Sequence, residues 1–587
     1  MKADTLRIIP LGGMGEVGRN MMVYEYNREI LIVDTGLMFP ENDMLGIDYI
    51  IPDISYLKDK QSWVKGIVIT HGHEDHTGAI RHILDEVQAP IYGTPLTIGL
   101  LGAKLSRSGM LDKAELIIIK AGDAFQVGKY FHVETFHVCH SIPDGVGLGI
   151  QTPAGLIVHS GDYKFDHTPV DNWPTDYAKL AEFSERGVLA LLADSTNAER
   201  PGWTPSEKVI DPAFDKVFRE AKDRIIVATF ASLISRIQQV ANTAARHGRK
   251  MAFAGTSMVD NAKIALKLGY LDIPEELIIP IDQALNLPKS QVVIMCTGSQ
   301  GEPTSILGRL AIGQNRQFDV IPGDTIVLSS HPIPGNEEAV SRTINRLFER
   351  GAIVIYESIA AVHVSGHASQ EEMKLLMHLT RPKFFIPIHG ELRHLKQHAH
   401  LATQVGIPAE NTLVIQNGQS VEFHANTMKL GEKFSGSYIF VDGDKVGDIA
   451  PDVMRDREMM AEEGVVLVNL LLNTQGALAS QPEIQTRGFL MTRDEETLKS
   501  IATTRIKDVI LHANGNMQKD VEKAVRNVLY SETRRRPLVI VTVNYIDKPA
   551  LKQSAPVAAR KAAPQVNANW HRKTRKKQAK KPAPQTV

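Results

Sequence analysis

Cysteine is almost absent from this chain of 587 residues, which contains only Cys139 and Cys296. Two thiols cannot build the disulfide framework that holds small secreted domains together. They are also too few for a structural zinc site made of thiolates. The scarcity of cysteine excludes both designs, and it predicts a protein of the reducing cytoplasm.

Long apolar runs are absent as well. No stretch approaches the roughly 20 consecutive apolar residues that a membrane-spanning helix needs. The N-terminal sequence MKADTLRIIP has no apolar segment like the centre of a signal peptide. With 43% hydrophobic and 23% charged residues, the composition is that of a soluble globular protein. The length predicts roughly three or four domains.

The formal net charge of −1 conceals an uneven distribution. Residues 549–587 contain ten Lys or Arg and no acidic residue, which leaves 56 basic against 67 acidic residues in the rest of the chain. The same segment is rich in Ala, Pro and Gln, a composition that buries little apolar surface. We therefore expect an acidic globular body followed by a basic, disordered tail.

Apolar runs alternate with turns over the first 200 or so residues, for example in EILIVDTG, GIVIT, GLIVHSGD and LALLADST. Helical periodicity lies between them, as in TGAIRHILDEV, so the segment predicts a layered α/β fold. After TNAERPGWTP the elements lengthen, with helices expected at 211–223 and 235–248 around a strand at 224–230. The predicted domains are a layered α/β domain in two parts (1–205 and 347–431), an inserted α/β unit (206–346), a linker (432–451), a small α/β unit (452–548) and the tail (549–587).

The segment GMGEVG, from Gly13 to Gly18, matches the G-x-G-x-x-G pattern of dinucleotide-binding folds. That pattern also requires a helix to begin there, with an acidic residue about 20 positions later. Instead the strand-like segment MMVYEY follows at once, after the strand-like RIIPL. We expect a pair of strands here and no dinucleotide site.

A cluster of ionisable residues follows the apolar segment GIVIT. His71, His73, Asp75 and His76 lie within six residues of one another. Imidazole and carboxylate groups are the ligands that zinc and similar divalent ions take in proteins. A lone histidine would be explained by a solvated loop, but four potential ligands at the end of one strand predict a metal site.

Three further candidate ligands each follow an apolar run: His140, Asp162 and His389. Taken singly, each could be a cap or a histidine bonded to the backbone. Their shared position makes convergence of several strand ends the better interpretation. Seven ligands are more than one tetrahedral ion can bind, but they suit two ions that share a bridging carboxylate. Such a pair can polarise a phosphoryl oxygen and activate water.

These motifs carry a resemblance to known proteins. H-x-H-x-D-H after a strand resembles the metallo-β-lactamase superfamily, and DSTNAE, VHVSGH and PIHGE resemble its β-CASP nucleases. Together with PLGGMGEVGRN, FPENDMLGIDYIIPD, CTGSQGEP and PIPGNE they look like the ribonuclease J family, from Leu6 to about Tyr545. SETRRRPLVIV resembles the last domain of that family more loosely.

The resemblance implies a metallo-β-lactamase αββα sandwich with an inserted β-CASP domain and a small C-terminal α/β domain. It implies a zinc-dependent ribonuclease with two Zn²⁺ per subunit, for which Mn²⁺ or Mg²⁺ could substitute. The implied activity is 5′-to-3′ exonuclease cleavage of single-stranded RNA, preferring a 5′-monophosphate, with endonuclease cleavage as a second mode. Messenger decay, ribosomal RNA maturation, a homodimer or homotetramer, and ribosome or degradosome association are also implied.

The resemblance also assigns roles by position. His71, His73 and His140 would bind one zinc, Asp75, His76 and His389 the other, and Asp162 would bridge them. His367 would protonate the leaving oxygen, with Asp194 orienting it, so that the implied catalytic residues are His367, Asp194, Asp162 and Asp75.

Substrate-binding residues are also implied. Ser365, Gly366 and His367 offer donors for a phosphate near the RNA 5′ end, although a turn with a hydroxyl cap would look the same. Ser232 and Arg236 look placed to meet the RNA, with helix capping and surface charge as the competing explanations.

Two other functions are weighed. Another metallo-β-lactamase-fold hydrolase is disfavoured because the redox branch has Glu in place of His73, and small-molecule hydrolases lack the insertion after DSTNA. An inactive RNA-binding scaffold should have lost ligands, whereas here all seven positions are filled. The tail sequence WHRKTRKKQAKK either solubilises the chain end or attracts RNA phosphates, with Trp570 stacking on a base.

Overall fold

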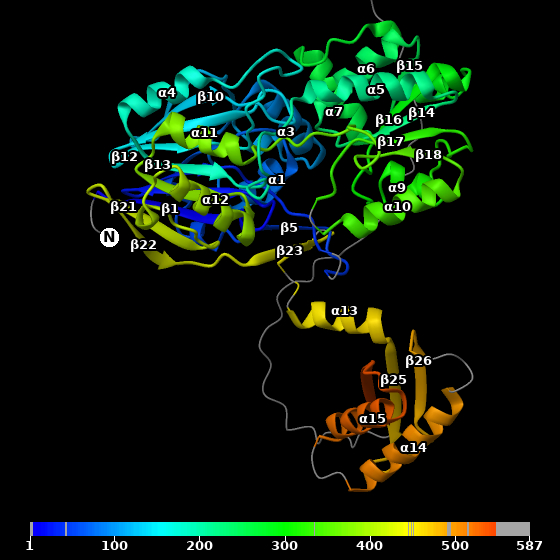
Figure 1. Ribbon diagram of the computed structural model, residues 1–587. Coiled ribbons are helices and arrows are strands. Elements are labelled where there is room, and N and C mark those ends of the chain that lie inside the picture. The colour runs from blue at the N-terminus through cyan, green and yellow to red at the C-terminus, as the bar shows by residue number, and fades with distance from the viewer. Residues whose placement is uncertain are drawn as a thin grey trace, which may run out of the picture. The chain divides into compact units, whose positions relative to one another are not determined.

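The computed structural model describes residues 4–41, 44–333, 335–443, 445–447, 449, 451–489, 495–512 and 516–546. The chain forms two compact units, Met1–Glu458 and Met459–Val587 (Figure 1). The predicted basic tail, 549–587, lies outside the described residues. Among the helices that are described, none is both long and apolar enough to span a lipid bilayer.

Two sheets face one another in the first unit. The larger has eight strands, in the order β22 (Thr427–Lys433), β21 (Gln419–His424), β1 (Leu6–Gly12), β3 (Met21–Tyr26), β4 (Glu29–Val33), β6 (Val64–Val68), β7 (Ile91–Gly93) and β8 (Leu116–Ile118). The smaller has six, in the order β19 (Phe384–Ile388), β13 (Val188–Asp194), β12 (Gly155–His159), β11 (Val146–Thr152), β10 (Phe131–His137) and β9 (Ala124–Val127). Both sheets contain strands from before and after the insertion, as predicted.

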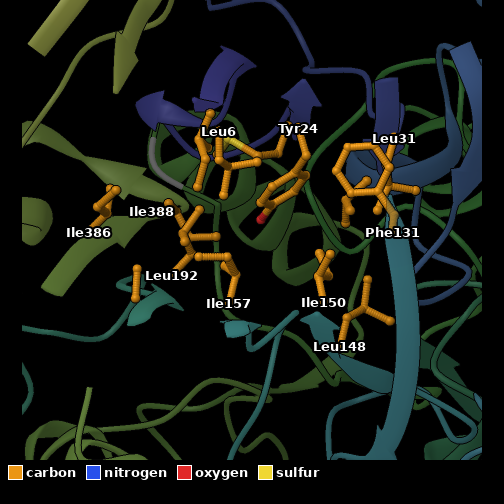
Figure 2. Packing of buried hydrophobic residues seen from close by; sticks show 14 of the residues in the cluster. Leu6, Tyr24, Leu31, Phe131, Leu148, Ile150, Ile157, Leu192, Ile386 and Ile388 are labelled. Atoms are coloured by element: carbon orange, nitrogen blue, oxygen red, sulfur yellow. The ribbon is translucent and has the colours of Figure 1, made fainter. Parts of the chain in front are cut away.

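The inner strands, such as β4 and β13, are apolar on both faces because both faces are covered. In β4, Leu31 and Val33 join the core between the sheets, whereas Ile30 and Ile32 pack outward. Figure 2 shows the inner core, where Leu31 lies beside Phe131 of the opposite sheet. The predicted αββα sandwich is therefore confirmed.

Helices form the two outer layers of the sandwich. The eight-stranded sheet packs against α2 (Ile80–Glu86) and α3 (Pro95–Arg107). The six-stranded sheet packs against α4 (Tyr177–Arg186), α11 (Gln370–Thr380) and α12 (Leu392–Gln404). The helix predicted in TGAIRHILDEV corresponds to α2, which follows the short α1 (Glu74–Thr77).

The inserted domain has one parallel sheet, in the order β15 (Lys250–Ala254), β16 (Val292–Cys296), β14 (Ile225–Ala228), β17 (Thr325–Leu328) and β18 (Ile353–Ile355). One face packs against α5 (Ile210–Glu220), α6 (Ile234–Arg246) and α7 (Thr256–Leu268). The other packs against α8 (Ile281–Ala284), α9 (Ile306–Ala311) and α10 (Glu337–Glu349). Parallel sheets covered on both faces have fully apolar strands, as β14 and β16 do.

Two predicted boundaries differ from the structure. The segment AIVIY was placed in the second part of the sandwich, but β18 pairs with β17 in the inserted sheet. An apolar run does not reveal which of two parallel sheets it joins. The predicted linker, 432–451, contains β23 (Tyr438–Asp442) and β24 (Lys445–Val446). Of these, β23 pairs with β5 (Tyr49–Pro52), a partner almost 400 residues away in the sequence.

The glycine-rich segment forms the loop between β1 and β3, which pair antiparallel as predicted. Within it, β2 (Met14–Gly15) pairs with β20 (Gly390–Glu391), directly after His389. A Cβ at Gly12 would lie 1.8 Å from the carbonyl oxygen of Arg19. Gly12 therefore permits close backbone packing beside a candidate ligand. No helix begins among the described residues between β1 and β3, so the segment lacks the helix that the dinucleotide interpretation requires.

The second unit has a sheet in the order β26 (Glu483–Arg487), β25 (Val465–Leu472) and β27 (Leu538–Tyr545). Helices α14 (Glu495–His512) and α15 (Met517–Thr533) share its core. Helix α13 (Pro451–Glu463) precedes β25. The helix expected near LKSIATTRIKDVILHA is confirmed by α14.

Candidate metal centre and catalytic site

The candidate ligands lie just after strand ends at one edge of the sandwich, in loops or, for Asp75 and His76, in the short helix α1. His71, His73, Asp75 and His76 follow β6, and His140 follows β10. In the six-stranded sheet, which also contains β10, the strands β12, β13 and β19 are parallel neighbours, so Asp162, Asp194 and His389 meet at the same edge. The predicted convergence of strand ends therefore occurs in the structure.

Three imidazoles form the first group. His73 Nδ1 lies 3.1 Å from His71 Nε2 and 3.2 Å from His140 Nε2. Nitrogen atoms at these distances can share one ion of tetrahedral preference, leaving the remaining position to another ligand. The group is made of the donors that zinc prefers.

Asp162 lies between this group and a second one. Its Oδ2 lies 3.2 Å from His76 Nε2 and 3.7 Å from both His71 Nε2 and His140 Nε2. Its Oδ1 lies 2.9 Å from His389 Nδ1. Asp75 completes the second group, with Oδ2 3.6 Å from His76 Nε2. A carboxylate with one oxygen near each group has the geometry of a bridging ligand.

The hydrogen bonds around the imidazoles test whether these groups fit metal ions. His140 Nδ1 donates to the Gly366 carbonyl at 2.8 Å, which leaves its Nε2 facing the centre. Among the described residues, neither ring nitrogen of His389 has a hydrogen bond, although Nδ1 is close to Asp162 and the ring is buried. Fixed tautomers and an unsatisfied buried imidazole are both features of metal-ligating histidines. The residues fit zinc.

Asp34 was not among the residues predicted from the sequence. Its Oδ2 accepts a hydrogen bond from His76 Nδ1 at 2.8 Å, and its Oδ1 accepts one from the Thr70 backbone N–H, also at 2.8 Å. Carboxylates in this position orient a ligating histidine and raise its basicity. The sequence signal that could have revealed Asp34 is its position directly after the strand EILIV. In the structure its backbone has φ +63°. Position 36 requires glycine, because a Cβ there would lie 1.6 Å from the Asp75 carbonyl oxygen.

Burial and charge divide the histidines into two kinds. Burial lowers the pKa of His73 to about 4 and that of His140 to about 3, so both are neutral and able to ligate. Burial also opposes the charged forms of His76 and His389. There the nearby carboxylates, led by Asp162, together outweigh burial and hold each pKa well above its usual value. The second group therefore attracts positive charge.

His367 and Asp194 form a pair beside both groups. His367 Nδ1 lies 2.7 Å from Asp194 Oδ2, and Asp194 Oδ1 lies 3.5 Å from His389 Nδ1. Burial lowers the pKa of His367, but the carboxylates of Asp194 and, to a smaller extent, Asp162 together raise it above the usual value. Thr196 fixes the Asp194 carboxylate by donating its N–H and hydroxyl to Oδ1. The carboxylate thus favours the protonated form of the imidazole next to the two groups.

The turn that contains Ser365, Gly366 and His367 packs against the first group. Asn197 Nδ2 donates to Ser365 Oγ at 2.8 Å and to the His367 carbonyl at 3.0 Å. A Cβ at Gly366 would lie 2.7 Å from His140 Nδ1. The turn is therefore built tightly into the centre, through contacts that the sequence did not predict.

The structure does not place Arg236 where it could meet RNA, which corrects the expectation from the sequence. Its side chain is fully buried. Nη2 donates to Glu207 Oε2 at 2.8 Å and Nη1 to the Val362 carbonyl at 2.8 Å. The sequence showed a cation at the start of a helix, but not the buried carboxylate that pairs with it. Ser232 is half-buried in the loop before α6.

Comparison with known families follows the same division of the chain. Residues 14–180 match the metallo-β-lactamase superfamily, and residues 222–347 match the β-CASP domain of ribonuclease J. Residues 352–411 match a Zn-dependent metallo-hydrolase RNA specificity domain, and residues 452–546 match the ribonuclease J C-terminal domain.

Whole-chain relatives agree. Ribonuclease J of Synechocystis is 41% identical over 92% of this chain and 87% of its own length. Ribonuclease J of Thermus thermophilus is 43% identical, with 92% and 95% covered, and ribonuclease J2 of Bacillus subtilis is 42% identical, with 92% and 98% covered. The chain belongs to the ribonuclease J family.

As a member of the ribonuclease J family, the chain is a hydrolase that acts on RNA. A solved protein of unknown function from Enterococcus faecalis covers 71% of this chain and all of its own, with a TM-score of 0.50 and 16% identity. That likeness supports the fold alone. The alternative of a different metallo-β-lactamase-fold hydrolase is set aside by the ribonuclease J matches.

Proposed function

We propose that the chain is a two-zinc 5′-to-3′ exoribonuclease that prefers RNA with a 5′-monophosphate and cleaves internally as a second mode. The observation that carries this proposal is the convergence of seven donor residues beside the His367–Asp194 pair. Family membership supplies the substrate class, and RNA maturation and decay are the cellular roles that follow from it.

Each ligand has a proposed place. His71, His73 and His140 would hold one zinc, Asp75, His76 and His389 the other, and Asp162 would bridge them. Bound there, two such ions would supply Lewis-acid polarisation of the phosphoryl group and activation of water, with Mn²⁺ or Mg²⁺ as substitutes.

His367 would donate a proton to the oxygen that leaves the phosphorus. Asp194 raises the pKa of His367, which favours its protonated form, and general acid catalysis of this kind contributes typically 10²- to 10⁴-fold. Asp194 would act by orienting the ring and stabilising its charge. Asp162 and Asp75 would contribute by fixing the ions.

The turn at Ser365 and Gly366 would receive a phosphate near the RNA 5′ end. The Ser365 hydroxyl and the backbone N–H of Gly366 can donate hydrogen bonds at a turn, as anion-binding turns do. Ser232 would meet the RNA from the inserted domain. A homodimer or homotetramer, and association with ribosomes or a degradosome, are further parts of this proposal.

The test follows one labelled RNA that carries a 5′-monophosphate, a 5′-triphosphate or a 5′-hydroxyl, incubated with the zinc- or manganese-loaded protein. We expect mononucleotides to be released fastest from the monophosphate, and no product from an Asp162→Ala variant. Internal fragments that do not depend on the 5′ end would make the enzyme mainly an endonuclease. If none of the three RNAs is cleaved, the result would favour an RNA-binding scaffold without activity.

An Asp194→Asn variant tests the proton donor separately. Without the carboxylate the pKa of His367 falls, so the protonated form is lost at lower pH. We expect the zinc content to stay at the wild-type level while the alkaline limb of the kcat profile moves to lower pH. An unchanged profile would remove His367 from this role.

A further inference from the structure

Glu207 lies where the chain passes from the sandwich into the inserted domain. It begins a short 3₁₀ turn, Glu207–Val209, directly before α5. Its side chain is only 6% exposed, although an unpaired carboxylate is strongly disfavoured in the interior of a protein. Nothing in the proposed chemistry uses this residue.

The polar atoms of Glu207 face partners from both sides of the domain boundary. Its N–H donates to Asp166 Oδ2 at 2.9 Å, and its Oε1 lies 3.5 Å from Lys164 Nζ, at an ion-pair distance without a hydrogen bond. On the other side, its Oε2 accepts from Arg236 Nη2 at 2.8 Å, and its carbonyl accepts from Gln239 Nε2 at 2.9 Å. The first two partners belong to the sandwich, and the last two belong to α6.

Lys164 and Arg236, the two cations that pair with Glu207, are each close to a part of the proposed catalytic site. Lys164, which is 1% exposed, follows the bridging residue Asp162 by two positions. Arg236 donates from Nη1 to the Val362 carbonyl and also contacts Ser329 Oγ, which donates to the same carbonyl at 2.6 Å. Val362 begins the segment that ends at His367. One buried carboxylate therefore connects the loop of Asp162 with the segment of the proton donor.

We infer that Glu207 is a positioning residue, which holds the inserted domain and the segment Val362–His367 in register with the metal centre. This inference rests on the proposed function for its effect on cleavage, but not for the contacts themselves. Removal of the negative charge leaves Lys164 and Arg236 buried with Asp166 as the remaining nearby anion, and unpaired buried charges force the surrounding structure to shift.

The variant Glu207→Gln keeps the shape and an acceptor for Arg236, but it turns an amide donor towards Lys164. The matched control is Asp324→Asn. Asp324 is also buried and pairs with Arg224 at 2.5 Å, but both residues belong to the inserted domain alone. The two variants remove the same kind of buried charge, one across the domain boundary and one within a domain.

We expect Glu207→Gln to lower kcat on 5′-monophosphorylated RNA roughly 10- to 100-fold, because small displacements of positioned groups have effects of this size. KM and zinc content should stay near the wild-type values. Hydrogen exchange at residues 362–367 should become faster. Asp324→Asn should lower the unfolding temperature without changing kcat or the exchange of that segment.

The inference is overturned if Glu207→Gln lowers only the unfolding temperature, or if both variants reduce kcat equally. Arg236→Lys is the second variant in case Glu207→Gln does not fold. Lysine keeps the charge but lacks the two separate nitrogens with which Arg236 bonds the Val362 carbonyl and Glu207. Faster hydrogen exchange at residues 362–367 is therefore expected for this variant as well. If the wild-type protein cleaves no RNA, the proposed function fails, and the exchange measurement alone decides the role of Glu207.

Discussion

Asp34 offers a sharp test of the metal centre because it contacts a proposed ligand without being one. We consider the variant Asp34→Asn. The residue has φ +63°, a conformation that Asn tolerates as well as Asp does, so the backbone should not change. The variant therefore alters only the hydrogen bonds of one buried side chain.

The size of the effect follows from those bonds. Asp34 accepts from the Thr70 N–H at 2.8 Å, the Thr70 hydroxyl at 2.9 Å and His76 Nδ1 at 2.8 Å. In Asn an NH2 group replaces one of the two carboxylate oxygens. At least one of the three donors then faces this NH2 group instead of an acceptor. An unsatisfied buried donor costs about 1–3 kcal/mol. Loss of the partner of a ligating histidine lowers metal affinity about 10- to 100-fold, which is about 1.4–2.7 kcal/mol.

Zinc binding to metal-free protein, measured in competition with a chromophoric chelator, tests this expectation. One of the two zinc ions, the one assigned to His76, should bind about 10- to 100-fold more weakly, and the other should be unaffected. Asp324→Asn serves again as the control, since it changes a buried carboxylate in the inserted domain. The reasoning fails if Asp34→Asn binds both ions as the wild type does, or if the control loses zinc equally.

Three further predictions follow. Gly366→Ala places a Cβ 2.7 Å from His140 Nδ1, so we expect about 10- to 100-fold weaker zinc binding, by the same chelator titration. His398 is fully buried, and burial lowers its pKa to about 3, so the unfolded state takes up the proton below about pH 6.5 and stability falls in acid. His398→Gln should reduce the stability lost between pH 7.5 and 5.5 by about 1.4 kcal/mol in urea unfolding. Removal of residues 549–587 should weaken RNA binding and flatten its dependence on salt concentration, with kcat unchanged.

Each of these predictions has an outcome that contradicts it. Full zinc occupancy in Gly366→Ala at limiting metal would show that the turn can move away from His140 without harm. An equal loss of stability in acid for His398→Gln and the wild type would mean that other groups account for it. A salt dependence unaltered by removal of the tail would leave the tail with no part in RNA binding.

Local patterns in the sequence were enough to predict most elements and to single out the seven candidate ligands that the structure brings together. Apolar runs of strand length gave the strands of both sheets, and the hairpin interpretation of GMGEVG held because the helix signal was missing. The candidate ligands were recognisable because each lies at, or within a few residues of, the end of an apolar run. Such signals are weak in 432–451, which was predicted to be a linker. In the structure this segment contains β23 and β24, and β23 pairs with β5.

By itself the sequence determined what depends on neighbours in the chain: strand and helix periodicity, the order of the domains, and the residue types available at each strand end. Only the tertiary structure decided which groups face one another. It paired Asp34 with His76, Gly366 with His140 and Arg236 with Glu207. The physical reason is that a buried charge or donor is defined by its partner, and these partners are 29 to 226 positions away in the sequence. No local pattern records contacts between residues so far apart.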